Sequence, residues 1–276
     1  MSTPLFATRL DFAEIDSTNR FARRWVELPS FSWGDLPALI VAQRQNAGEG
    51  RQGKCWHSPE GCLMFSVVFS REATQIPLPK TPLVGLATAL AIVDWVRFWL
   101  PEPLASKFGI HWPNDVYFLA ETGKFQKLSG ILVESLASGI LVTGVGINLH
   151  NSVRQAPDFL RSTLVTLADL APEVGNAHSR ETFLETFLEI WWQRIGEIRS
   201  DEKKLIQEID ALCTQKNCHV TLHTPRGAVT GFCRGLASDG AILLDGKPYY
   251  CGESSEESKK NPSTAQVDRG IGEPMN

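Results

Sequence analysis

No extended run of lysine or arginine occurs in the 276 residues, and 31 acidic side chains outnumber 27 basic ones, giving a formal net charge of −4. Proteins that bind nucleic acids through the phosphate backbone concentrate positive charge on one face or segment. Because this chain has no such concentration, we expect no nucleic-acid partner.

The cysteines lack the spacing of a metal site or a redox pair. None of the six forms a Cys-x-x-Cys pair, and Cys213-x4-Cys218-His219 has no second ligand pair at zinc-finger spacing. We therefore expect ordinary reduced thiols.

Signals for export or membrane insertion are also missing. The N-terminus, residues 1–6, has no basic region followed by an apolar core and a small-residue cleavage site. The most apolar segment, residues 83–100, contains Asp94 and Arg97, which favours a buried helix over a membrane span. We expect a cytoplasmic protein with no membrane partner.

Apolar residues make up 43% of the chain, enough for one large domain and a small one. Alternating or continuous apolar runs predict strands, and apolar spacings of three, four and seven predict helices with one buried face. Together they indicate an α+β domain over residues 1–210, built on a mixed sheet with helices. The predicted strands are residues 39–42, 63–69, 127–134 and 140–147, and the predicted helices are residues 18–26, 83–100 and 179–198.

The sequence changes character after Lys204. Short alternating segments beginning at Cys218, Gly227 and Ala241 are separated by glycine-containing turns. This pattern predicts a small β-barrel over residues 211–252. Residues 253–276 contain almost no apolar side chains and are predicted to form a disordered tail.

The most informative segment is the glycine-rich loop of residues 45–56, in which three glycines lie close to Arg51 and Lys54. Glycine lets backbone amides approach an anion without interference from a Cβ, and successive amides form an anion-binding concavity. The loop is therefore a candidate phosphate or carboxylate site.

Two other interpretations of this loop compete with that one. Its Gly-x4-Gly-Lys spacing matches a P-loop, but Cys55 stands where a Ser or Thr hydroxyl would bind magnesium. A P-loop also opens directly into a helix, whereas residues 57–69 predict a turn and a strand. The P-loop is thus disfavoured, and a purely structural glycine-rich hairpin remains the alternative.

Four further motifs occur in a fixed order around this loop: Glu14-Ile-Asp-Ser-Thr-Asn19, Trp112-Pro-Asn-Asp-Val-Tyr117, Lys127-Leu-Ser-Gly-Ile-Leu-Val-Glu134 and Gly144-Val-Gly-Ile-Asn-Leu149. Each would be weak alone. Together, from about residue 10 to about residue 252, they resemble the biotin protein ligases, or biotin–[acetyl-CoA carboxylase] ligases.

The resemblance implies a fold, a reaction and partners. The fold would be like that of class II aminoacyl-tRNA synthetases and biotin ligases, with a C-terminal SH3-like barrel. The enzyme would use ATP and Mg²⁺ to activate biotin as biotinyl-5′-AMP and would transfer biotin to a lysine of a biotin carboxyl carrier protein. The partner would be the carrier of acetyl-CoA carboxylase or a related carboxylase, and a homodimer is an open option.

The resemblance also assigns residues to biotin. Ser17, Thr18 and Asn19 would face the ureido head together with Gln45, because hydroxyls and amides supply the donors and acceptors that a buried urea needs. The residues alone also predict a helix N-cap at this point, and both roles can hold. The implied biotin-binding residues are Ser17, Thr18, Asn19, Gln45, Gly48, Glu49, Gly50, Arg51, Lys127 and Gly130.

Three residues would carry the chemistry. Arg51 would clamp the biotin carboxylate and the α-phosphate, Lys127 would stabilise charge during phosphoryl transfer, and Asp115 would bind Mg²⁺. The implied ATP-binding residues are Arg51, Lys54, Trp56, His111, Asn114, Asp115, Lys127 and Asn148.

Several of these residues also have a purely structural interpretation. Taken alone, Trp112-Pro-Asn-Asp115 predicts a turn after a strand, Lys127 a solvated residue at a strand edge, and Asn148 a strand-end turn.

Glu49 and His111 depart from the pattern, because the family commonly has Arg or Lys at the first position and Lys at the second. We expect Glu49 to point away from the triphosphate or to pair with Lys54. An imidazole at position 111 would be largely neutral at pH 7 and could change charge between pH 5 and 8, so we expect the affinity for ATP to depend on pH.

Three alternative functions remain. Lipoate ligases share the fold and the two-step chemistry, although the motifs favour biotin. Some relatives are repressors with an N-terminal helix-turn-helix, but the Ser-Thr-Asn motif starts at Ser17, so we expect the short form without a DNA-binding domain. Glu49 and His111 also leave open a non-catalytic biotin-binding homologue.

Overall fold

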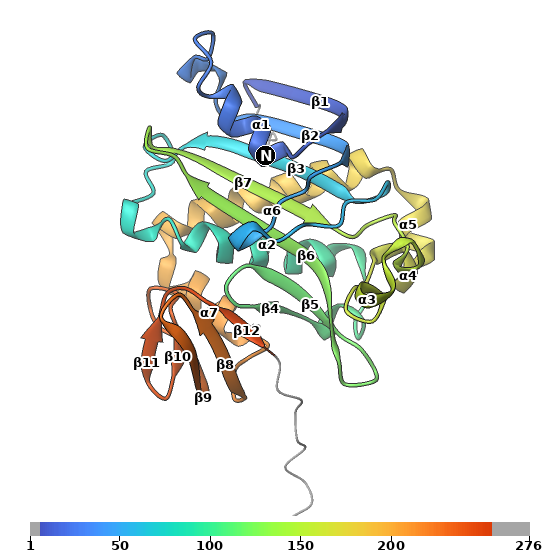
Figure 1. Ribbon diagram of the computed structural model, residues 1–276, viewed down its shortest axis with the longest axis vertical. Coiled ribbons are helices and arrows are strands. Elements are labelled where there is room, and N and C mark those ends of the chain that lie inside the picture. Colours follow the sequence, from blue (N-terminus) through green and yellow to red (C-terminus); the bar gives the residue numbers. More distant parts are fainter. Residues whose placement is uncertain (1–5, 256–276) are drawn as a thin grey trace, which may run out of the picture.

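The centre of the protein is a seven-stranded sheet (Figure 1). The computed structural model describes residues 6–255. The strand order of the sheet is β1-β2-β3-β7-β6-β5-β4, with β1 and β2 parallel and every other neighbouring pair antiparallel. The predicted mixed sheet is therefore confirmed. The strands are β1 (Thr8–Ile15), β2 (Ala38–Gln45), β3 (Leu63–Ser70), β4 (Phe108–His111), β5 (Asp115–Leu119), β6 (Phe125–Ser135) and β7 (Ile140–Ile147).

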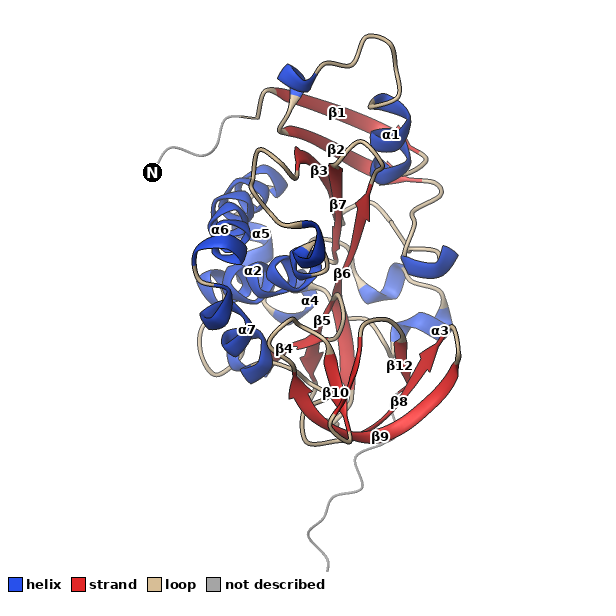
Figure 2. Cartoon of the chain, turned by 90° about the vertical axis from the view of Figure 1, so that its left-hand side faces the viewer, coloured by secondary structure: helices blue, strands red, loops and turns tan. Residues whose placement is uncertain are grey.

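Helices cover the two faces of this sheet unequally (Figure 2). The longest two, α2 (Leu83–Trp99) and α6 (Arg180–Ser200), pack together on one face, and α1 (Thr18–Trp25) covers part of the other. The remaining helices are α3 (Asp158–Arg161), α4 (Leu167–Leu170), α5 (Pro172–Ala177) and α7 (Glu202–Ala211).

The continuous apolar run of β2 follows from this double coverage. Successive strand side chains point to opposite faces, so Leu39 and Val41 join the large core under α2 and α6, whereas Ala38 and Ile40 join the small core under α1. A strand buried on both faces cannot show polar alternation.

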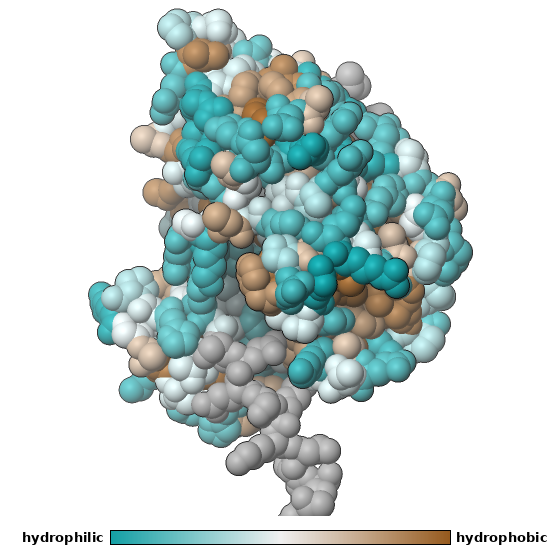
Figure 3. Space-filling model, turned by 45° about the vertical axis from the view of Figure 1, so that its right-hand side comes forward, coloured by the Kyte–Doolittle hydropathy of each residue, from teal (hydrophilic) through white to brown (hydrophobic). Residues whose placement is uncertain are grey.

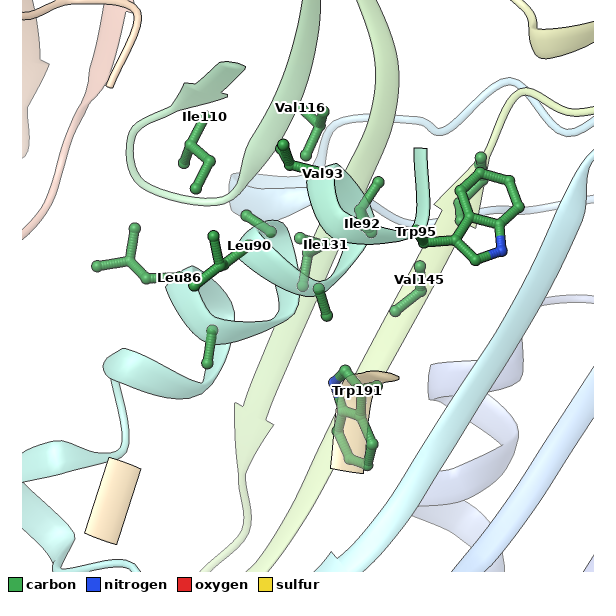
Figure 4. Packing of buried hydrophobic residues seen from close by; sticks show 14 of the residues in the cluster. Leu86, Leu90, Ile92, Val93, Trp95, Ile110, Val116, Ile131, Val145 and Trp191 are labelled. Carbon is green, nitrogen blue, oxygen red and sulfur yellow. The ribbon is translucent and has the colours of Figure 1, made fainter. Parts of the chain in front are cut away.

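The helix predicted for residues 83–100 is confirmed as a buried helix. Side chains of α2, Leu90 and Val93 among them, lie beside Ile110, Val116 and Ile131 of the sheet (Figure 4). Within residues 6–255, no helix combines the length and the apolar composition needed to cross a membrane.

The C-terminal part is an antiparallel sheet with the strand order β11-β10-β9-β8-β12. Its edge strands are not paired with each other among the described residues, so the sheet is open and the closed barrel stays a prediction. The strands are β8 (His219–Thr224), β9 (Gly227–Leu236), β10 (Ile242–Leu244), β11 (Lys247–Tyr249) and β12 (Glu253–Ser255).

The boundary predicted at residue 252 needs correction. Residues 253–255 do not belong to a tail, because they form β12 and pair with Thr221–His223 of β8. Backbone pairing with an exposed edge strand orders a segment that has no apolar side chains of its own. The rest of the predicted tail, 256–276, lies outside the described residues.

The surface fits an ordinary polar exterior. Most of the face in Figure 3 is hydrophilic, and its apolar side chains lie in separate patches. All six cysteines lie within the described residues and none forms a disulfide, as expected.

Candidate active site

A cleft of about 250 Å³ lies where the sequence motifs converge. Its walls come from the start of α1, the glycine-rich loop, the β4–β5 turn, β6, β7 and β12. The predicted site residues that line it are Ser17, Thr18, Asn19, Gln45, Glu49, Gly50, Arg51, Lys54, Trp56, His111, Asn114, Asp115, Lys127 and Gly130.

One end of the cleft is a polar pocket at the start of α1. Ser17 caps the helix by accepting a bond from the Arg20 amide, so the N-cap interpretation holds for this residue. Thr18 donates its backbone amide (2.7 Å) and its hydroxyl (3.2 Å) to Gln45 Oε1. Both helix residues are buried yet line the cleft, so one helix start provides both a cap and a wall.

The floor of this pocket requires glycines. A Cβ at Gly144 would lie 2.1 Å from Asn19 Oδ1, and one at Gly146 would lie 2.6 Å from the Trp56 indole. Alternate residues of a strand share a face, so the Gly-Val-Gly spacing of β7 opens two adjacent places on that face. Asn19 and Trp56 occupy them.

A β-bulge decides which side chains of β6 border the cleft. Val116 pairs with Ser129 but Tyr117 pairs with Lys127, so Leu128 is an extra residue in the ladder. A bulge changes which side chains share a face, and here Lys127 and Gly130 both border the cleft. Regular alternation would have put them on opposite faces.

The cationic groups of the cleft are held by polar partners. Lys127 Nζ donates to Asp115 Oδ2 at 2.6 Å, and Arg51 Nη1 donates to Asn114 Oδ1 at 3.0 Å. The lysine therefore has a fixed counter-ion, while the arginine is positioned by a neutral amide.

The indole of Trp56 extends the wall beside these cations. Its ring centroid lies 5.6 Å from Lys127 Nζ. Its Nε1–H is buried and has no hydrogen-bond partner among the described residues.

The glycine-rich loop closes on itself instead of opening a helix. Gly50 N donates to Lys54 O at 2.6 Å, and Trp56 N donates to Gly48 O at 2.9 Å. Gln52 (φ 54°) and Gly53 (φ 75°) turn the chain through the left-handed region, which glycine adopts most easily. The chain then reaches β3 without a helix longer than one short turn, as the case against a P-loop predicted.

Glu49 does not pair with Lys54. Its carboxylate turns to α1, where it accepts bonds from Arg20 and Arg23, and Lys54 pairs with Glu253 of β12 instead. Of the two expected alternatives, pairing with Lys54 is contradicted, and an orientation away from the triphosphate stays a prediction.

His111 differs from expectation in its charge. The residue is 8% exposed, and burial lowers its pKa to about 4, with Asp115 opposing the shift and Lys127 reinforcing it. Burial therefore favours the neutral ring, and the predicted change of charge between pH 5 and 8 is not supported.

Two predicted residues do not line the cleft. Asn148 is buried, its Nδ2 donates to Lys127 O (3.2 Å), and its Oδ1 accepts from Asn151 (3.2 Å), so its amide ties β7 to β6 and the following loop. Gly48, within the loop, packs against its neighbours, because a Cβ there would meet Ser58 Oγ at 2.6 Å. Both positions shape the site without facing it.

Sequence reasoning missed other residues that line the cleft. Tyr117 belongs to one of the sequence motifs but was given no role. It lines the cleft, and its ring centroid lies 4.7 Å from that of His111. Gly144 and Gly146 could have been found from their alternate spacing. Glu253 and Ser254 carried no sequence signal, because they reach the cleft only through the pairing of β12 with β8.

The donor set fits a magnesium ion that arrives with phosphates. Within residues 6–255, no cluster of three His, Cys, Asp or Glu side chains could hold a metal by itself. Mg²⁺ commonly uses only one or two carboxylates and completes its shell with phosphates and waters. Asp115, which lines the cleft, supplies one such carboxylate.

Comparisons with known proteins agree with this geometry. Residues 12–151 match the Biotin/lipoate A/B protein ligase family. The bifunctional ligase/repressor BirA of Bacillus subtilis (strain 168) is 30% identical over 214 residues, which cover 75% of this chain and 61% of the relative. The chain thus spans about three fifths of the length of that relative.

A second relative and a solved structure are covered more completely. A biotin–[acetyl-CoA-carboxylase] ligase of Mycobacterium tuberculosis is 31% identical over 208 residues, covering 75% of this chain and 73% of the relative. The structure of biotin protein ligase from Aquifex aeolicus in complex with biotin and ATP has a TM-score of 0.69 and 28% identity, covering 90% of this chain and 97% of that one.

Proposed function

Because the chain belongs to the Biotin/lipoate A/B protein ligase family, we propose that it is an ATP-dependent biotin–protein ligase. It forms biotinyl-5′-AMP and passes biotin to a lysine of a biotin carboxyl carrier protein, which belongs to acetyl-CoA carboxylase or a related carboxylase. The observation that carries this proposal is the meeting of Arg51, Lys127 and the polar α1 pocket in one cleft.

In the first step, a carboxylate oxygen of biotin attacks the α-phosphorus of ATP, and the bond to the β-phosphate oxygen breaks to release diphosphate. The two reactants are anions that repel strongly in a cleft of low dielectric. Arg51, positioned by Asn114, and Lys127, positioned by Asp115, bring cationic donors to this place before the reaction starts. Preorganised charge lowers the barrier because it does not have to reorient during the reaction.

In the second step, the neutral amine of the carrier lysine attacks the acyl carbon of the mixed anhydride, and AMP leaves. The lysine loses its proton and biotin ends in an amide bond. Until then the anhydride must be kept from water. Trp56 and the glycine-rich loop are the elements that border it.

The ureido head of biotin binds at the start of α1 in this proposal. Thr18 and Asn19 present polar atoms there, with Gln45 behind them. Gly144 lets Asn19 pack against the pocket floor, since any side chain at position 144 would displace it.

Mg²⁺ would be held at Asp115 together with the ATP phosphates, and it would supply positive charge to the leaving diphosphate. This role is compatible with a single carboxylate.

The C-terminal sheet, in this proposal, is the SH3-like domain expected from the resemblance. It contributes Glu253 and Ser254 to the cleft wall. A cytoplasmic location, the domain division near residue 210 and a homodimer remain predictions.

The test is a carrier assay. The purified protein is incubated with biotin, ATP, Mg²⁺ and an apo carboxylase carrier domain, and the carrier mass is measured. A mass increase equal to biotin in amide linkage supports the proposal. A parallel reaction with lipoate and a lipoyl carrier tests the alternative, and modification there alone would contradict it. No adenylate and no modified carrier would favour a non-catalytic homologue.

A further inference from the structure

We propose that Arg20 and Arg23 of α1 are positioning residues of the ligase reaction, and that through Glu49 they hold the glycine-rich loop over the cleft before any substrate binds. The role in turnover rests on the proposed function. The loop-holding role does not.

The contacts form a two-sided clamp on one carboxylate. Arg20 Nε lies 2.5 Å from Glu49 Oε1, and Arg23 Nη2 lies 3.0 Å from Glu49 Oε2. Residues three apart in a helix lie on the same face, so one turn of α1 supplies a guanidinium for each oxygen. Burial raises the pKa of Glu49, but the hydrogen bonds from the two arginines outweigh it, and the pKa is lowered overall.

The clamp continues into the predicted biotin pocket. Arg23 Nη1 also donates to Glu134 Oε1 of β6, and Glu134 Oε2 accepts a bond of 2.8 Å from Asn19 Nδ2. Asn19 in turn accepts a bond of 2.6 Å from Ser66 Oγ at its own Oδ1. A continuous series of polar contacts therefore joins the loop to the residue that faces the ureido head.

The loop needs such an anchor because glycine loses more conformational freedom on ordering than any other residue. The loop's other described ion pair is a single contact between Lys54, 65% exposed, and Glu253, 26% exposed. Glu49, 21% exposed, instead meets two arginines, which are 40% and 33% exposed. Exposed pairs contribute little. The clamp at Glu49 is thus the stronger connection, and it fixes a residue two positions from Arg51.

This geometry also explains the acidic residue at position 49. With two arginines in reach, the carboxylate is bound to α1 and its charge is balanced there. The substitution relative to the common family pattern then serves to close the loop instead of opposing ATP.

The first test measures loop opening without any substrate. Arg51 and Lys54 are trypsin sites inside the loop, so the rate of cleavage after them, followed by mass spectrometry under native conditions, reports its opening. We expect Arg20→Gln, Arg23→Gln and Glu49→Gln each to cleave there about two- to fivefold faster than wild type, the size expected for a partly exposed ion pair. Added salt should accelerate wild type and have less effect on the variants.

Arg24→Gln is the matched control. Arg24 lies on the same helix but pairs with Asp16, outside the clamp. Its loop cleavage should equal that of wild type. If Arg24→Gln speeds cleavage as much as Arg20→Gln and Arg23→Gln do, α1 has merely been destabilised and the inference is wrong.

The second test is charge exchange with an enzymatic measurement. In Arg20→Glu with Glu49→Arg, the new pair can re-form while Glu134 still balances Arg23. Both single variants should be cleaved faster than wild type, and the double variant should be cleaved as slowly as wild type.

In turnover, clamp variants should raise KM for biotin and ATP and release adenylate faster, with kcat changed less than KM.

The outcomes separate the two proposals. If wild type makes adenylate but the clamp variants match it in cleavage, KM and adenylate release, the clamp is wrong and the ligase assignment stands. If the variants open faster while no protein makes adenylate, the ligase assignment fails and the loop-holding role stands. A double variant that cleaves as fast as the single variants would also overturn the clamp.

Discussion

His111 Nε2 lies 2.5 Å from Ser254 Oγ, and its Nδ1 lies 2.9 Å from Thr214 Oγ1. One imidazole on β4 therefore joins the large sheet to the segment after α7 and to β12. Because both ring nitrogens have hydroxyl partners, each tautomer of the neutral ring can be satisfied. A proton added to this buried ring would instead bring a charge into a desolvated place, which Asp115 offsets only in part.

Protonation of His111 should destabilise the protein in acid. The folded pKa, about 4, is below the ordinary value of 6.5, so between these values the unfolded state binds more protons. Stability from this residue is complete above pH 6.5 and falls as the pH drops toward 4, by about 3 kcal/mol in total. Urea denaturation at several pH values measures this loss.

The control for that experiment is His111→Gln, which can still hydrogen-bond but cannot titrate in this range. Carboxylates titrate in both proteins, so the difference between their curves reports His111 alone. Parallel curves for the two proteins from pH 7 to 4 would show that the histidine is not held neutral. Titration of His111 should contribute no change in KM for ATP between pH 6 and 8.

Removal of either cleft cation should slow adenylate formation. Arg51→Ala and Lys127→Ala should each reduce its rate by ~10²–10³, the usual cost of losing one preorganised charge at a transition state. Diphosphate release in single turnover measures it. Lys124→Ala, on an exposed turn before β6, is the control and should be silent. Full activity in either cleft variant would refute its catalytic assignment.

The position of a C-terminal truncation should decide its effect. A chain ending at Ser255 keeps β12 and should retain wild-type Tm and KM for ATP. A chain ending at Gly252 loses the contacts of Ser254 with His111 and Gln215 and of Glu253 with Lys54. Its Tm should fall by about 2–4 °C and its KM for ATP should rise. Identical behaviour of the two truncations would mean that β12 contributes nothing.

An added methyl group on the cleft floor should weaken biotin binding. Gly144→Ala would place a Cβ against Asn19 and should lower the affinity for biotin by about tenfold or more, because roughly 1.4 kcal/mol of lost contact is enough. Calorimetric titration measures the affinity. Gly196→Ala, with nothing within 4 Å of its Cβ, is the control. Gly196→Ala should leave the affinity for biotin unchanged and should slightly stabilise α6. An unchanged affinity in Gly144→Ala would place the ureido pocket elsewhere.

The sequence by itself determined the parts of this protein that depend on local patterns. Apolar periodicity gave β3, β6, β7, α2 and α6 close to their observed ends, because it records which side of an element is buried. Motif order then indicated which polar residues share a cleft, and most of them line it.

Only the tertiary structure decided which distant groups meet. Glu49 binds arginines 26 and 29 positions away, Asn148 turns inward to hold Lys127 O, and β12 enters the cleft because the edge of β8 is available. The low pKa of His111 depends on its burial, and its ring contacts Thr214 and Ser254, more than 100 positions away. No local pattern contains these facts, because burial, ion pairing and edge pairing depend on the packing of segments far apart in the sequence.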